Sequence, residues 1–217
     1  MRNVFAKSVL AAAVAGSMMM GAATTASAEV SASFAASNMY LWRGLNLSPT
    51  GGVVSGSLDY NHDSGFYAGI WTSSENQGHE VDIYAGFAGE IGGLGYDVSY
   101  WNYMYPESGV DVDLMDNNAE DIVVGLTFGP VFATFYQGID SDNDEDLYYT
   151  VGFNYDKFTV FYGGWDLENG NDDYSHVQVG YQATDELSFA VSKASDSGFG
   201  AEEDPLFQVT YSLGFDL

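Results

Sequence analysis

After Leu206, the last eleven residues of the chain alternate strictly between apolar and small or polar side chains. The segment reads LFQVTYSLGFDL over residues 206–217, and every second residue from Phe207 to Leu217 is apolar. A β-strand would gather these apolar residues on one face, whereas a helix would scatter them around its surface. Because the chain stops there, we expect this strand to pair with an earlier one. If that partner is the first strand, the sheet closes into a barrel and leaves no open edge.

The first 28 residues predict a secretory signal peptide. A basic start precedes a small-residue apolar run over residues 9–20, and the sequence ASA at residues 26–28 fits the A-x-A cleavage rule. The alternative is a membrane anchor, but the apolar run is too short and too interrupted for a membrane-spanning helix. We therefore expect cleavage after residue 28 and a single domain over residues 29–217.

The balance of charged and aromatic residues narrows the class of protein. Residues 29–217 contain three basic residues against all 31 acidic residues of the chain, so they offer no basic patch for nucleic acid. Disordered acidic proteins are poor in aromatic residues, whereas this chain has 16 Tyr, 14 Phe and 26 Gly, which favours a β-protein. It has no cysteine and no phosphate-loop, dinucleotide or zinc motif, so we expect no cofactor.

Segments of alternating polarity recur along the chain and predict twelve strands. In the first predicted strand, apolar residues occur at both odd and even positions, so it is unclear which face is apolar. A β-bulge would explain this change of alternation. The predicted strands cover residues 31–45, 53–60, 66–73, 81–91, 94–105, 120–128, 131–138, 147–155, 158–165, 174–183, 187–194 and 206–217. The connections between them alternate between long and short, and the long ones include residues 46–52, 74–80, 106–119, 139–146, 166–173 and 195–205.

This alternation of connections is typical of outer-membrane barrels, which have an even number of strands, short periplasmic turns and longer outer loops. Most of the acidic residues lie in or beside the long connections, away from the apolar faces. The alternative is a soluble barrel, but the faces rich in Gly, Ser and Thr would fill an apolar core badly. We predict an all-β transmembrane up-and-down antiparallel barrel in the outer membrane of a Gram-negative bacterium. Its expected partners are membrane lipid, lipopolysaccharide and the β-barrel assembly machinery.

Two stretches resemble the TorF family of porin-type proteins, also catalogued as a Gcw_chp-type bacterial family. They are SNMYLWRGLNLS at residues 37–48 and GSLDYNHDSGFYAGIWTSS at residues 56–74, and Arg43-Gly44 and residues 59–69 carry the match. The resemblance implies an outer-membrane location, a β-barrel and a pore role, without a substrate. The chain departs from the usual outer-membrane pattern in ending with Leu217 rather than Phe.

The polar faces of the predicted strands supply candidate pore-lining residues. An acidic lining would favour cations over anions, so we predict passive diffusion of small cationic or neutral solutes. The alternative is a non-conducting structural or surface barrel whose acidic loops bind divalent cations, lipopolysaccharide or a partner. Inward aromatic residues would favour that alternative by plugging the lumen. The candidate pore-lining residues are Arg43, Ser57, Asp59, Asp82, Glu90, Asp97, Asn154, His176, Gln178 and Gln182.

Two further kinds of site deserve a test. Some twelve-stranded barrels are lipases, but none of the three histidines (His62, His79 and His176) stands in a convincing catalytic triad, so we predict that the chain is not an enzyme. The spacing D-x-D-x-D begins a calcium loop, although Gly at its sixth and Glu at its twelfth place are missing. A looser calcium site remains the alternative to a solvated acidic loop, at Asp140, Asp142 and Asp144. The sequence specifies neither a solute nor an oligomeric state.

Overall fold

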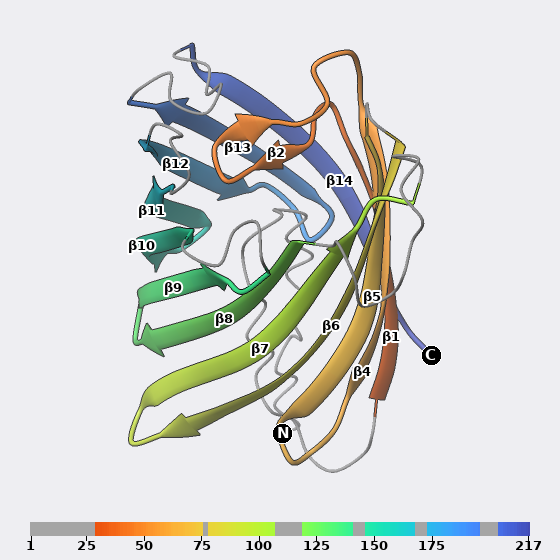
Figure 1. Cartoon of the computed structure of the whole chain (residues 1–217), viewed down its shortest axis with the longest axis vertical. Helices are drawn as coiled ribbons and strands as arrows, with labels where there is room; N and C mark the ends of the chain where they lie inside the picture. Colours follow the sequence, from red (N-terminus) through yellow and green to blue (C-terminus); the bar gives the residue numbers. More distant parts are fainter. Residues whose placement is uncertain (1–28, 76–77, 107–118, 141–145, 168–172, 196–203) are drawn as a thin grey trace, which may run out of the picture.

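Twelve antiparallel strands close into one barrel in the computed structural model of the chain (Figure 1). The structure describes residues 29–75, 78–106, 119–140, 146–167, 173–195 and 204–217. The barrel strands are β1 (Glu29–Ser37), β4 (Val53–Asn61), β5 (Phe66–Glu75), β6 (Gly78–Ile91), β7 (Leu94–Met104), β8 (Ala119–Phe128), β9 (Val131–Gly138), β10 (Leu147–Tyr155), β11 (Phe158–Asp166), β12 (Tyr174–Gln182), β13 (Leu187–Ala194) and β14 (Leu206–Asp216). Two short strands, β2 (Leu41–Trp42) and β3 (Leu45–Asn46), pair only with each other.

The barrel closes where the last strand meets the first. β14 pairs with β1 in antiparallel register, from Ser31 opposite Asp216 to Ser37 opposite Thr210. Each of the other strands pairs with its neighbours in chain order, apart from the step from β1 to β4. The predicted all-β barrel of twelve strands is confirmed. So is the closure expected from the alternating C-terminal segment.

The wall is apolar outside and polar inside. On β14, Phe207, Val209 and Tyr211 are 61%, 42% and 49% exposed. The residues between them, Gln208 and Thr210, are only 5% and 2% exposed. Every barrel strand contributes large exposed apolar side chains to the same belt. A soluble barrel has the opposite arrangement, and a soluble monomer rarely exposes so large an apolar surface. The described residues include no helix that is long and apolar enough to span a membrane.

The prediction of one first strand over residues 31–45 is wrong beyond Ser37. There the backbone amide of Asn38 still donates to the carbonyl of Val209, and its side chain adds two bonds to β14: the side-chain nitrogen donates to the carbonyl of Phe207, and the side-chain oxygen accepts from the amide of Val209. The chain then leaves the wall. The change of parity that suggested a bulge therefore marks the end of the strand.

The predicted polar loop over residues 74–80 is also wrong. The strand pairing of β5 and β6 continues to Ser74 opposite His79 and Glu75 opposite Gly78. Polar side chains do not prevent backbone pairing, so the sheet extends beyond the apolar belt. Elsewhere the boundaries agree closely, and β9, β10 and β13 coincide with the predicted segments.

Candidate functional site

Residues 38–52 connect β1 to β4 and fold into the barrel interior; we call them the inner segment. Leu41 and Leu45 are 1% and 6% exposed, and the β2–β3 hairpin joins them in one tight unit. At its turn Arg43 and Gly44 both have positive φ, 48° and 84°. Two positive φ values are the mark of a two-residue type I′ hairpin turn. Since a side-chain-bearing residue rarely adopts this conformation, contacts of Arg43 with the wall must stabilise it.

Arg43 forms a buried ion pair with Asp121 of β8. Its Nη2 donates to Oδ2 of Asp121 at 2.5 Å, and both side chains are almost fully buried. Burial by itself would lower the pKa of Arg43, but the Asp121 carboxylate holds that pKa above its ordinary value. The guanidinium therefore remains charged inside the barrel.

Aromatic rings enclose the Arg43 guanidinium. It lies 4.5 Å to 4.9 Å from the ring centroids of Trp42, Tyr136, Tyr148 and Trp165. Cation–π attraction is stronger where the charge is desolvated, as it is here. Three of these rings come from β9, β10 and β11, so the wall itself provides the cage for the inner segment.

Backbone carbonyls of the inner segment are held by side chains of the last strands. The hydroxyl of Tyr174 donates to the carbonyl of Arg43 at 2.8 Å. The amide of Gln208 donates to the carbonyl of Met39 at 3.0 Å. Leu41 completes the attachment in an apolar cluster on the same side of the barrel. The inner segment is therefore a packed part of the interior.

Gly44 fits against the ring of His176 with no room for a side chain. A Cβ atom at Gly44 would lie 2.6 Å from Cγ of His176. His176 is itself fixed, because its ring nitrogens contact the hydroxyls of Tyr148 at 2.8 Å and Ser192 at 3.2 Å. The ring cannot move aside without breaking these contacts.

Substituting Gly44 by alanine should therefore lower the free energy of unfolding by about 2 kcal/mol. Positive φ and the clash with His176 both contribute. The measurement is urea unfolding in detergent micelles, followed by tryptophan fluorescence. Gly51→Ala is the matched control in the same segment, because a Cβ there would meet nothing within 4 Å. Equal stability of the two variants would contradict the tight contact at Gly44.

Stacked aromatic rings occupy the interior face of β6 and β7. The ring centroids of Tyr84 and Trp101 are 4.2 Å apart at an angle of 17°, and Tyr103 stacks beyond Trp101 at 6.1 Å and 19°. The rings therefore cover one another's faces. Carboxylates accept hydrogen bonds beside them: Asp97 from the Tyr67 hydroxyl at 2.9 Å, and Asp59 from the Tyr84 hydroxyl. Trp101 and Tyr103 point inward, and they alternate along β7 in phase with Asp97.

The structure places every candidate pore-lining residue on the inside of the barrel, nine of them on the wall and Arg43 on the inner segment. Burial divides them into two groups. Almost completely buried are Arg43, Asp82, Asp97, His176 and Gln178. Solvent reaches Ser57, Asp59, Glu90, Asn154 and Gln182, which are half-buried or exposed. A role in lining a pore stays a prediction for both groups. For the buried group the observed role is packing.

The partners of Arg43 could not be identified from the sequence. Asp121, Tyr136, Tyr148 and Trp165 come from four different strands, and only the register of the closed sheet brings them together. One signal did exist, since Arg43 is the single arginine of residues 29–217. A lone arginine in so acidic a chain indicates a specific role, but it does not identify the carboxylate.

The calcium hypothesis falls largely outside the described residues, where Asp142 and Asp144 lie. Asp140 is described, and its Oδ2 accepts a hydrogen bond from the amide of Glu120 at 3.0 Å. Within the described ranges there is no group of three or more His, Cys, Asp or Glu residues that could hold a metal ion. A calcium site at this loop stays a prediction.

Two serine–histidine contacts bear on hydrolytic chemistry. His176 and Ser192 are both buried, with exposures of 1% and 0%, so a substrate could not reach them. His62 contacts the hydroxyl of Ser64 at 2.9 Å within an exposed turn. His79, expected in a loop, lies on β6. None of these arrangements presents an activated nucleophile in a cleft.

Comparisons with known proteins agree with the barrel architecture. A family model described as "Bacterial protein of unknown function (Gcw_chp)" matches residues 21–206. No curated protein sequence matches the chain significantly. Among solved structures, a KdgM porin is 7% identical, with 86% of this chain and 99% of that chain covered at a TM-score of 0.51.

Two further solved structures align at lower TM-scores. The Acinetobacter baumannii outer membrane protein Omp33 is 10% identical, with 88% of this chain and 98% of that chain covered at a TM-score of 0.44. Outer membrane phospholipase A from Escherichia coli is 13% identical, with 85% and 91% covered, also at 0.44. At 7% identity, the likeness to the KdgM porin concerns the fold alone.

Proposed function

The chain belongs to the Gcw_chp family of bacterial proteins of unknown function, and we propose that it is a porin-like outer-membrane channel for small cationic or neutral solutes. The observation that carries the proposal is the division of the wall into an apolar outer belt and a polar interior. A closed barrel satisfies all backbone hydrogen bonds between its strands, which hydrocarbon requires of any spanning structure. The pore role implied by the resemblance to the TorF family stays a prediction.

The proposed location carries three further expectations. Residues 1–28 would be removed as a signal peptide during export, which leaves the barrel of residues 29–217. The assembly machinery would insert the barrel, and lipid and lipopolysaccharide would then surround its apolar belt. Passage would be passive diffusion, since the proposal requires no cofactor and no energy source.

The acidic interior supports the proposed preference for cations. Asp59 and Glu90 reach solvent on the inside of the wall, whereas the one arginine of the interior is paired with Asp121. Fixed carboxylates raise the local concentration of cations and exclude anions. The inner segment would narrow the passage and limit it to small solutes.

A second candidate function is a non-conducting surface barrel. Two observations favour it: the inner segment is packed inside the barrel, and the stacked rings of Tyr84, Trp101 and Tyr103 add bulk beside it. Its acidic loops would then meet divalent cations, lipopolysaccharide or a partner. Conductance separates the two candidates directly.

Purified barrel in a planar bilayer should conduct, and its reversal potential under a KCl gradient should show preference for K⁺ over Cl⁻. The double variant Asp59→Asn/Glu90→Gln should reduce this preference about twofold for each charge, because a charge at roughly 8 Å in water contributes about 0.5 kcal/mol. Glu120→Gln is the control, since that carboxylate accepts hydrogen bonds from Tyr100 and Asn102 on the outer face of the wall. Absence of conductance would support the surface barrel, and anion preference would refute the cation pathway.

A further inference from the structure

Lys193 projects from the outer face of β13. Its neighbours along the strand, Ser192 and Ala194, are buried inside the barrel with exposures of 0% and 3%. Its partner across the sheet is Val177 of β12, which is 49% exposed on the outside. Lys193 therefore lies in the outer surface of the wall, beside the apolar belt.

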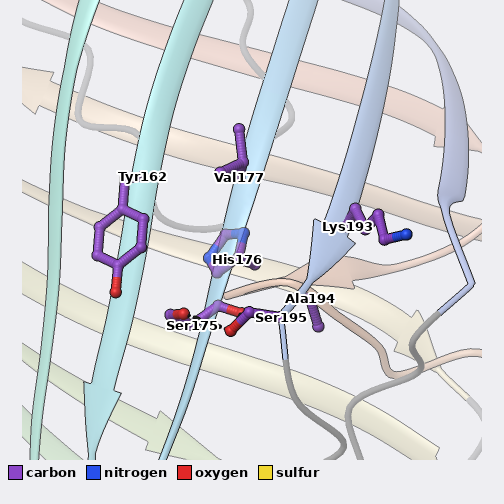
Figure 2. Close-up of a pocket in the computed structure, with 7 residues that line it drawn as sticks. All are labelled: Tyr162, Ser175, His176, Val177, Lys193, Ala194 and Ser195. Atoms are coloured by element: carbon purple, nitrogen blue, oxygen red, sulfur yellow. Dashed lines mark hydrogen bonds between the residues drawn. The ribbon is translucent and has the colours of Figure 1, made fainter.

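Lys193 lines one side of a shallow groove of about 250 Å³ on the outer wall (Figure 2). Tyr162, Ser175, Val177, Lys193 and Ser195 line it, and its surface is almost entirely apolar. The hydroxyls of Ser175 and Ser195 lie 2.6 Å apart.

The groove lies at the border of the apolar belt. Below Lys193, Val179 and Val191 are exposed on the same two strands. Above it the outer face carries the hydroxyls of Ser175 and Ser195. A lysine costs about 2–4 kcal/mol at the centre of a bilayer but only about 0–1 kcal/mol near its surface. At this border the ammonium group would be level with lipid headgroups.

The charge of this surface is unusual for the chain. Residues 29–217 contain three basic residues. Arg43 is buried with Asp121, and Lys157, in a short turn at the opposite end of the barrel, donates to the carbonyl of Ala183. Lys193 is thus the one basic residue on the outer wall at the end with the long connections. Carboxylates such as Glu120 and Asp166 occupy the described rim elsewhere.

We propose that the ammonium group of Lys193 binds the phosphate group of a membrane lipid, and that the apolar groove beside it accommodates part of an acyl chain. The acyl chains would lie on Val177 and Val191, which are exposed on the same two strands. A cation beside an apolar surface matches a phosphorylated lipid, whereas a free anion would use only the cation. The inference rests on the membrane location proposed above.

The test compares two titrations of the purified barrel in a detergent without phosphate groups. One uses a phosphorylated disaccharide lipid, and the other uses the same lipid after removal of its phosphates. Native mass spectrometry measures the bound fraction. The phosphorylated form should bind about tenfold more tightly, which corresponds to about 1.4 kcal/mol. Lys193→Gln should lose this advantage and Lys193→Arg should keep it. Lys157→Gln, at the other end of the barrel, is the matched control and should bind like the wild type.

Three results would overturn the inference. They are equal binding of both lipid forms, unchanged binding by Lys193→Gln, and displacement of the lipid by millimolar inorganic phosphate, which would identify a free-anion site. A second measurement separates this proposal from the proposed function. The wild type is added to vesicles of phosphate-free glycolipid, and its insertion and its conductance are measured. If the protein inserts and conducts, but the lipid phosphate has no effect on binding, the proposed channel function is supported and the proposed lipid site is refuted. If the wild type inserts into neither type of vesicle, the membrane location itself is wrong.

Discussion

Substituting Asp121 by leucine should lower the free energy of unfolding by about 3–5 kcal/mol, because the charge of Arg43 would remain buried without its carboxylate. The inner segment should then leave its place, since the uncompensated guanidinium gains more from water than from its aromatic cage. Urea unfolding in micelles measures the loss. Fluorescence of Trp42 and Trp165, whose rings contact Arg43, reports on the cage itself. In a planar bilayer, release of the segment should raise the single-channel conductance.

The double variant Arg43→Met/Asp121→Leu is the matched control. Replacing both partners of a buried ion pair by apolar residues of similar volume is often neutral or stabilising. Most of the lost stability should therefore return in the double variant. If Asp121→Leu unfolds at the same urea concentration as the wild type, the ion pair does not hold the inner segment. If the double variant is as unstable as the single one, the loss of stability has a cause other than the unpaired charge of Arg43.

Substituting Leu58 by arginine should destabilise the inserted barrel by about 2–4 kcal/mol. Leu58 lies near the middle of β4 and is 48% exposed on the outer face, where the proposed bilayer would surround it. Unfolding from lipid vesicles, followed by the loss of the compact band in electrophoresis without heating, measures the effect.

Ser57→Arg provides the control one residue away. Ser57 faces the interior, where its hydroxyl donates to the carboxylate of Asp59 at 2.6 Å, so an arginine there would lie beside a negative charge in a polar lumen. We expect it to change the stability by less than about 1 kcal/mol. Equal effects at the two positions would show that hydrocarbon does not surround the outer face.

Period-two alternation was sufficient to predict the wall. In β14 the alternation of Phe207, Val209 and Tyr211 with polar residues identifies both the strand and its outward face. Short turns such as Gly92-Gly93, where both residues have positive φ, set the ends of the strands. These features are local, so a single sequence contains them.

The interior could not be predicted in the same way. Trp42 and Leu45 are as apolar as the lipid-facing residues of the wall. The sequence alone therefore does not show whether their side chains face lipid or the packed interior. The partners of Arg43 lie 78 residues away at Asp121 and 131 residues away at Tyr174. Such contacts depend on the pairing register of neighbouring strands, and the alternation of polarity along one strand does not specify that register.

The long separations within the cage also constrain the order of assembly. The hairpin that carries Arg43 is synthesised early, but its binding surface comprises β8 to β12, which follow much later in the chain. Contacts between distant residues form slowly, because the intervening chain must first be ordered. Since the partners of Arg43 come from β8 to β12, we expect its docking to follow the pairing of these strands and to be a late step of folding.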